Sequence, residues 1–197
     1  MEASEGKKTV LKFEKIAPHV YAALHALERT GWVRRGVENP ETVKEHTEAL
    51  IVLAQSLMEM LTPEETDGLF DMLEVHDWPE AIHGDEVILE LEPEKRTPLK
   101  DLKFENEKRA LEHMCADLPN GAEILRLWLR FETSPDAAAA FARQLDKYQA
   151  VEKAFEYEEA QGIALFEQFR AYSLNFIDHP LLLERIEALI MKWEAKT

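Results

Sequence analysis

The sequence contains one cysteine, Cys115, and no apolar run of about 18 residues, the length that a transmembrane helix requires. A single cysteine excludes a disulfide within the chain and is typical of proteins from a reducing compartment. The first ten residues, MEASEGKKTV, lack the apolar core of a secretory signal. We therefore expect a cytoplasmic protein that spans no membrane, with Cys115 buried as a small apolar side chain.

Basic residues are also few, since 23 Lys and Arg stand against 39 Asp and Glu, for a formal net charge of -16. Such an acidic surface repels phosphate backbones and anionic membranes, so neither a long nucleic acid nor a membrane is expected as a partner. A small nucleotide is not excluded, because a metal ion and one or two arginines can reverse the local field inside a pocket.

Strand patterns are absent, and apolar residues recur at helical intervals of three, four or seven, as in Val43, Leu50 and Leu53. A chain of 197 residues with 46% hydrophobic residues is long enough for one domain with a proper core. We predict an all-α protein, a single compact bundle of about eight helices over residues 1–197. Its core is expected at about 15–176, with a C-terminal helix at 180–195 packed on it.

Helix starts are predicted where a capping residue stands directly before a proline, because the cap accepts an N–H of the first turn and proline has none to satisfy. The pairs are Asn39-Pro40, Thr62-Pro63, Thr97-Pro98 and Ser134-Pro135, with His179-Pro180 as a weaker case. Glu65 completes a capping box with Thr62. Helices are predicted at about 15–29, 40–61, 63–78, 98–117, 122–132, 135–160, 162–174 and 180–195, with an irregular segment at about 79–97.

The pair His76-Asp77 is the first candidate for metal-binding chemistry. His76 shares a helical stripe with Leu69 and Met72, so its ring is expected to point inward. Pro79 disfavours helical backbone at Trp78, which places the pair at a helix end. At such an end, one imidazole nitrogen and one carboxylate oxygen can reach the same cation.

Two further polar residues fall on apolar or small-residue faces of predicted helices. His46 follows Val43 by three positions and precedes Leu50 by four. Asp146 shares its face with alanines, and a buried carboxylate is costly unless it meets a cation. Ordinary core roles are the alternatives: a hydrogen-bonded histidine at 46, or an ion pair between Asp146 and Arg143. Spacing alone does not show that these residues meet in space.

Five stretches of the chain resemble, in order and spacing, the HD-domain phosphohydrolase superfamily. They are Arg29-Thr30-Gly31-Trp32-Val33, then Glu41 to His46, then Val75-His76-Asp77 through Glu80-Ala81 to Gly84-Asp85, then Gln144-Leu145-Asp146-Lys147, and Glu156-Tyr157-Glu158. Within the superfamily the likeness is to the group that contains bacterial 5'-deoxynucleotidase and the eukaryotic HD domain-containing protein 2. The matching stretches span about 29 to 158, most of the chain.

The resemblance implies an HD-domain fold and a set of site residues. The family's metal ligands correspond to His46, His76, Asp77 and Asp146. Glu80 matches the catalytic acid or base, and Asp85 matches the aspartate of a Gly-Asp pair that helps to shape the nucleotide site. The segment implied to contact substrate phosphate and sugar contains Arg29, Trp32 and Arg35.

The implied activity is removal of the 5'-phosphate from a nucleoside monophosphate, in particular the deoxy form. Imidazole and carboxylate ligands suit a divalent metal ion, and the ligand types do not choose among Mn, Co, Fe, Zn and Mg. The ion would make a water acidic enough to attack phosphorus, and Glu80 would handle the proton. The chain departs from the family pattern at Trp78, at Pro79 and in the acidic stretch Val87 to Lys95.

Two alternatives stay open. One is an HD phosphohydrolase for another small phosphate ester or a cyclic nucleotide; an alarmone hydrolase is disfavoured, because Ala81 stands where that group carries a second acidic residue. The other is a metal-binding, non-catalytic helical interaction protein. A homodimer is expected. Its surface could be built from Leu127, Trp128, Phe131, Leu189 and Trp193, although their helical spacing favours a place in the core.

Overall fold

The computed structural model describes residues 12–86 and 93–196, which form eleven α-helices and one 3-10 helix. They are α1 (Pro18–Ala26), α2 (Thr30–Val33), α3 (Val43–Leu57), η1 (Met58–Met60), α4 (Pro63–Thr66), α5 (Leu69–Val75), α6 (Glu80–His83), α7 (Pro93–Cys115), α8 (Gly121–Thr133), α9 (Ala137–Gln161), α10 (Phe166–Ser173) and α11 (Pro180–Glu194). These residues contain no β-strand, and one isolated bridge joins Glu28 to Thr42. The predicted all-α class is confirmed, with more helices among the described residues than the eight predicted.

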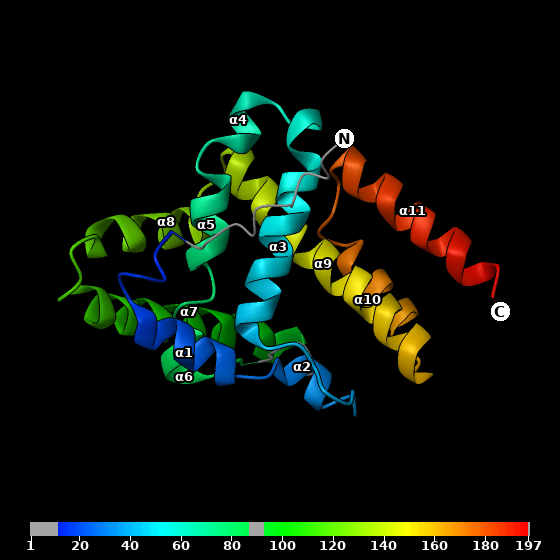
Figure 1. Cartoon of the computed structure of the whole chain (residues 1–197), viewed down its shortest axis with the longest axis horizontal. Helices are drawn as coiled ribbons and strands as arrows, with labels where there is room; N and C mark the ends of the chain where they lie inside the picture. Colours follow the sequence, from blue (N-terminus) through cyan, green and yellow to red (C-terminus); the bar gives the residue numbers. More distant parts are fainter. Residues whose placement is uncertain (1–11, 87–92, 197) are drawn as a thin grey trace, which may run out of the picture.

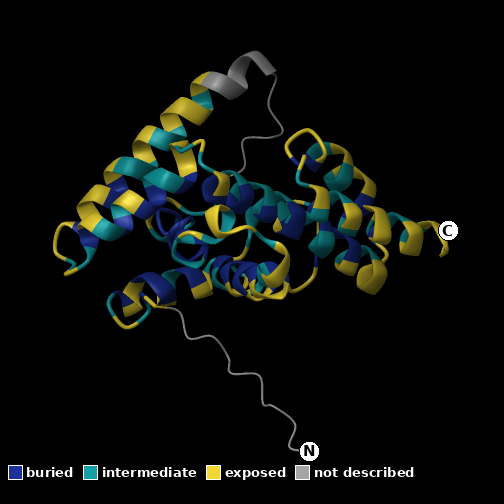
Figure 2. Ribbon diagram, turned by 90° about the horizontal axis from the view of Figure 1, so that it is seen from above, coloured by how far each residue is buried: buried dark blue, intermediate teal, exposed yellow. Residues whose placement is uncertain are grey.

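Helix α9, with 25 residues, is the element on which most of the others pack. Helices α3, α4, α5, α8, α10 and α11 all contact it, and α3 and α5 also contact each other. In Figure 1, α10 and α11 lie alongside α9 toward one end of the molecule, and α7 and α8 lie at the other. The buried residues gather in the middle, where these helices meet (Figure 2). The bundle thus brings α3, the end of α5 and α9 together at its centre.

Two helix starts carry capping boxes, and one of them was predicted. At α4, Thr62 accepts from the backbone of Glu65 and the Glu65 side chain accepts from that of Thr62, which confirms the predicted box. At α3 the predicted start at Asn39-Pro40 is wrong, because the helix begins at Val43 after a second box made by Thr42 and Glu45. Asn39 has a φ of 50° and belongs to the turn before it.

Other boundaries differ from the predictions for local reasons. The single helix predicted at 63–78 is divided into α4 and α5, because Gly68 between them has a φ of 68°, in the left-handed region. Helix α7 begins at Pro93 and includes Pro98, so the predicted start at Thr97-Pro98 is wrong. Pro93 offers the same favourable first position earlier in the chain. Helix α9 begins after Asp136, whose side chain caps it, and not at Ser134.

The segment predicted as irregular, 79–97, includes the short helix α6 and the first turn of α7. Residues 87–92, most of the acidic stretch that departs from the family pattern, lie outside the described residues. No helix among the described residues is both long and apolar enough to cross a membrane.

Most of the large apolar residues considered for a dimer surface belong to the core. Those buried there are Leu127, Trp128, Phe131 and Leu189. Trp193 is partly buried, and its indole N–H donates to Glu158 at 2.7 Å. The interpretation as core residues is therefore confirmed for the four buried ones, while the homodimer stays a prediction. Cys115 is buried as predicted, and burial raises the pKa of its thiol to about 11.

Candidate metal centre

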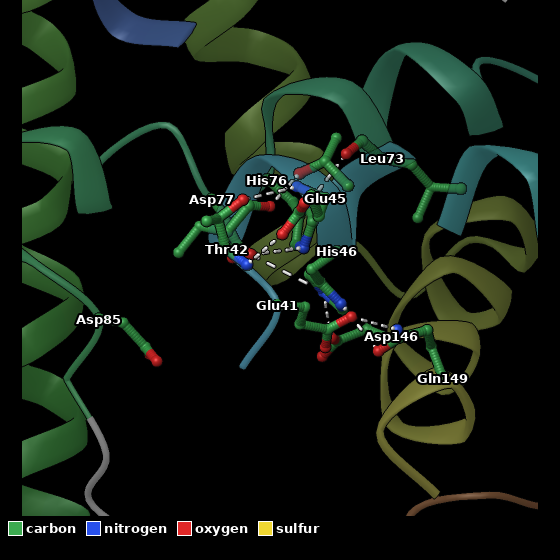
Figure 3. Close-up of polar contacts among 12 residues, drawn as sticks. Glu41, Thr42, Glu45, His46, Leu73, His76, Asp77, Asp85, Asp146 and Gln149 are labelled. Atoms are coloured by element: carbon green, nitrogen blue, oxygen red, sulfur yellow. Dashed lines mark hydrogen bonds and ion pairs between the residues drawn. The ribbon is translucent and has the colours of Figure 1, made fainter. Parts of the chain in front are cut away.

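Four side chains converge where three helices meet: His46 from α3, His76 and Asp77 from the end of α5, and Asp146 from α9. Nε2 of His46 lies 3.1 Å from Oδ1 of Asp146 and 3.8 Å from Oδ2 of Asp77. Nε2 of His76 lies 3.1 Å from the same Asp77 oxygen. Figure 3 shows the four side chains around this point. The structure thus brings the four predicted ligands together, although their sequence positions span a hundred residues.

Hydrogen bonds fix which nitrogen of each histidine carries the proton. Nδ1 of His76 lies 2.8 Å from the carbonyl oxygen of Leu73, which can only accept, so Nδ1 must donate. Nδ1 of His46 lies 2.8 Å from Oε1 of Gln149, an amide oxygen that also only accepts. In a neutral ring the other nitrogen, Nε2, then carries a lone pair. Both lone pairs point into the space between the carboxylates.

The two Nε2 atoms fit a cation better than they fit a purely internal contact. His46 is 0% exposed and His76 is 4% exposed. Neither Nε2 makes a hydrogen bond with any residue that the structure describes, despite the carboxylate oxygens 3.1 Å away. Lone pairs facing carboxylate oxygens repel one another unless a positive charge lies between them. One ligand atom each from His46, His76 and Asp77 can be chosen so that all three lie within 4.8 Å of one another. Imidazole and carboxylate donors at this spacing suit a divalent metal ion.

Charged neighbours keep both carboxylates ionised and therefore able to bind a cation. Burial alone would raise the pKa of Asp77. In the metal-free protein the two imidazoles can take up a second proton, and the charges of His76, His46 and Arg29 then outweigh burial and lower that pKa. Burial opposes a low pKa at Asp146 as well, and Lys147 and His46 overcome that effect. Lys147 Nζ lies 2.5 Å from Oδ2 of Asp146, which leaves Oδ1 directed at His46. The alternative partner Arg143 instead donates to backbone carbonyls of Phe131 and Ser134.

Glu80, the predicted acid or base, begins α6 three residues after Asp77 and is 9% exposed. Burial raises the pKa of Glu80 well above its usual value, and the negative charges of Asp77 and Asp85 raise it further. A raised pKa is the change that suits a carboxyl group to act as a general acid. The opposite charge is supplied by Arg29, whose pKa the nearby Asp77 and Asp146 raise despite its burial. Its Nη1 is buried and makes no hydrogen bond with the described part of the chain.

The other predicted substrate residues have partners within the protein. Asp85 lies apart from the four converging side chains (Figure 3), and its Oδ2 accepts from the backbone N–H of Thr30 at 2.6 Å, which holds the start of α2 beside Arg29. Trp32 is 2% exposed and stacks on Phe169 with ring centroids 4.5 Å apart. Substrate contact by Trp32 stays a prediction, since its observed contacts are internal.

Arg35 also contacts the protein itself. Its guanidinium donates to the carbonyl of Gly31 at 2.8 Å and to Gln168 at 3.2 Å, and it lies over the ring of Phe169. These contacts connect α2 with α10. Its role in binding phosphate, like that of Arg29, stays a prediction.

Two residues near the centre were missed by reasoning from the sequence. Gln149 holds Nδ1 of His46, and the buried Glu41 in turn accepts from the amide of Gln149 at 3.1 Å. One signal was available for Gln149, because it follows Asp146 by three positions and so shares its helical face. Helical periodicity gave no signal for Glu41, since it lies outside the helix that follows it, although it is the first residue of the matching stretch Glu41 to His46.

Known proteins can be compared with this geometry. The chain matches the HD domain family over residues 21–179. The 5'-deoxynucleotidase HDDC2 of Xenopus laevis is 30% identical over 192 residues, covering 94% of this chain and 88% of that protein. The 5'-deoxynucleotidase HDDC2 of Homo sapiens is 27% identical over 190 residues, covering 95% and 87%.

Solved structures share the fold. A conserved hypothetical protein from Pyrococcus furiosus superposes with a TM-score of 0.64 at 22% identity, over 87% of this chain and 96% of that one. A protein from Pyrococcus horikoshii OT3 gives a TM-score of 0.63 at 24% identity, over 86% and 94%. The family match spans most of the sequence and includes all four converging side chains. The chain therefore belongs to the HD domain family.

Proposed function

We propose that this protein is a metal-dependent phosphohydrolase that removes the 5'-phosphate from nucleoside 5'-monophosphates, the deoxy forms in particular. The observation that carries the proposal is the convergence of two buried histidine nitrogens, without a hydrogen bond from the described residues, with two carboxylates of lowered pKa beside the buried Glu80, whose pKa is raised. The 5'-deoxynucleotidases among its relatives support the choice of substrate, because they match this chain over nearly its whole length.

His46, His76, Asp77 and Asp146 would hold the divalent ion, whose identity among Mn, Co, Fe, Zn and Mg the donor set leaves open. When bound, such an ion supplies a more acidic water and positive charge for the phosphoryl oxygens. Water oxygen forms the new bond to phosphorus as the bond to the 5'-oxygen breaks. Glu80 gives its proton to that leaving oxygen, and the raised pKa of its carboxyl group suits this role.

Arg29 is the residue we assign to the phosphate. Its guanidinium carries a permanent charge beside Asp77 and Asp146, and its buried Nη1 has no hydrogen bond with residues 12–86 or 93–196. A guanidinium in this state can donate to a phosphoryl oxygen without breaking a protein contact at that atom. This local positive charge lets an anionic substrate enter a protein whose formal net charge is -16.

The test is phosphate release from ribo- and deoxynucleoside 5'-monophosphates after chelation and reloading with Mn, Co, Mg or Zn. Glu80→Gln should bind metal as the wild type does and lose about 100- to 10,000-fold in turnover, the usual range for a general acid. Glu86→Gln, an exposed change on the same segment, is the matched control and should keep full activity. Wild-type turnover by Glu80→Gln would refute the role of Glu80. No release by a folded wild type with any metal would refute the nucleotidase proposal and leave another phosphate ester, or a non-catalytic role.

A further inference from the structure

Glu41 is a buried carboxylate, 7% exposed, that uses both oxygens inside the protein. Oε1 accepts from the indole N–H of Trp32 at 3.1 Å, and Oε2 accepts from the amide of Gln149 at 3.1 Å. The ammonium of Lys153 lies 4.0 Å from Oε2. The backbone of Glu41 is held too, because its N–H donates to the hydroxyl of Tyr157 at 2.7 Å. Glu41 is therefore held in a fixed position, and Gln149 connects it to the metal ligand His46.

The carboxylate of Glu41 decides how the amide of Gln149 is turned. A carboxylate only accepts hydrogen bonds, so the NH2 group of Gln149 must face Glu41 and its oxygen must face His46. That oxygen holds the proton of His46 on Nδ1 and leaves the lone pair on Nε2. A reversed amide would present its NH2 group to Nδ1 and favour a proton on Nε2, where it would occupy the position of the metal.

The second histidine needs no such arrangement. Nδ1 of His76 donates to the carbonyl of Leu73, which belongs to its own helix and cannot reverse. Of the two rings, only that of His46 depends on a side chain that can turn in either direction. This difference makes the contact between Glu41 and Gln149 a point at which metal affinity can be set.

We infer that Glu41 and Gln149 are positioning residues that fix the tautomer of His46 and thereby the affinity of the protein for its divalent ion. The inference rests on the metal centre that the proposed function requires. Partners that orient a ligating histidine typically contribute about 10- to 100-fold in metal affinity. We expect changes of that size here, with the fold of the protein preserved.

The first experiment compares the Kd for Mn²⁺ of the wild type and two substitutions of glutamine by leucine. Gln149→Leu removes the acceptor for His46 and should weaken Mn²⁺ binding by about 10- to 100-fold. Gln161→Leu is the matched control. Gln161 also lies on α9, and like Gln149 it binds the segment before α3, in its case through the backbone N–H and carbonyl of Glu38. It does not contact His46, so its affinity for Mn²⁺ should equal that of the wild type.

A second pair of variants tests the hydrogen-bond directions themselves. In Glu41→Gln, the new amide faces two donors, the indole N–H of Trp32 and the NH2 group of Gln149, and its single oxygen can accept from only one of them. The amide of Gln149 is then free to reverse, so Mn²⁺ binding should weaken. Adding Gln149→Glu restores a complete set: the new amide accepts from Trp32 and donates to the new carboxylate, which accepts from His46. The double variant should therefore bind Mn²⁺ at least 10-fold more tightly than Glu41→Gln alone. Gln149→Glu in the wild type, where two carboxylates would face each other, should give no such gain, and the difference measures the coupling.

Nitrogen-15 NMR of the metal-free proteins provides a readout that a general loss of stability would not change. The wild type and the double variant should carry the His46 proton on Nδ1, and Glu41→Gln should show a proton on Nε2. Equal Mn²⁺ affinity of wild type and Gln149→Leu, or no gain from the second substitution, would overturn the inference while leaving the nucleotidase proposal intact. If Gln149→Leu does not fold, the comparison of Glu41→Gln with the double variant decides. Absence of Mn²⁺ binding by the active wild type would overturn the inference, and absence of both binding and activity would overturn both proposals.

Discussion

Glu74 connects the segment before α1 to the helix that carries His76. Its carboxylate is 4% exposed, and Oε1 accepts from the backbone N–H of Phe13 at 2.5 Å and from the hydroxyl of Tyr21 at 2.8 Å. The same two rings pack edge-on against Trp78, with centroids 6.1 and 5.7 Å away. Trp78 directly follows the ligand Asp77, so this anchor supports the backbone of the metal centre.

We predict that Glu74→Ala destabilises the protein by about 2–4 kcal/mol. The substitution leaves two buried donors without a partner, at about 1–3 kcal/mol each, and removal of a carboxylate that is itself costly to bury offsets part of that loss. Glu74→Gln keeps one oxygen acceptor and should lose less. Glu59→Ala, a change at an exposed position, should stay within about 0.5 kcal/mol of the wild type.

Urea unfolding in the presence of a chelator measures these differences without a contribution from metal binding. Burial raises the pKa of Glu74 above its ordinary 4.5, so the stability linked to this group is complete below pH 4.5 and declines as pH rises through the folded-state value. The loss in Glu74→Ala should therefore be larger at pH 5 than at pH 8. A loss under about 0.5 kcal/mol would refute the anchoring role, and a loss that grows with pH would refute the assigned direction of the pKa shift.

Three further predictions concern the metal, a helix cap and the phosphate contact. Mn²⁺ at about 100 times its Kd should add about 2.7 kcal/mol and raise Tm by about 5–10 °C in calorimetry, and an unchanged Tm would contradict the metal centre. Asp136→Ala should cost about 1 kcal/mol in urea unfolding at pH 7, because Asp136 caps α9. The loss should shrink as pH falls below about 3.8, since hydrogen bonding to Arg130 lowers the pKa of Asp136 and its stabilising effect disappears on protonation. Arg29→Met should lower kcat/KM by about 10- to 100-fold, the value of a charged hydrogen bond, without weakening Mn²⁺ binding, because it removes a cation that competes for the carboxylates.

Local periodicity was sufficient to place the two histidines. His46 shares the apolar stripe of α3 with Val43 and Leu50, and all three are buried as their spacing predicts. His76 lies at the end of α5, on the buried side with Leu69. Inward direction depends only on neighbours within two turns of helix, and these are visible in the sequence.

Helix boundaries were harder, because two acceptable start signals often lie close together and only packing selects between them. At α3 the chain uses the cap at Thr42 and not the one at Asn39, and at α7 it uses Pro93 and not Pro98. The division between α4 and α5 at Gly68 rests on a left-handed backbone conformation. A glycine permits that conformation without requiring it, so the sequence alone could not place the break.

The contact of His46 with Gln149 joins residues 103 positions apart, and that of Gln149 with Glu41 joins residues 108 positions apart. No local pattern encodes such pairs, because a buried glutamine or glutamate has the same helical spacing whatever lies opposite it. What does constrain them is energetic: a buried carboxylate or amide without partners would cost several kcal/mol, so each must meet complementary groups once the helices pack. The same requirement applies to the ligands, since two bare imidazole nitrogens beside two carboxylates are satisfied when a metal ion joins them. Packing of α3 and α5 against α9 is therefore what brings the ligands together, and substitutions that loosen these helix contacts should reduce metal affinity before they unfold the protein.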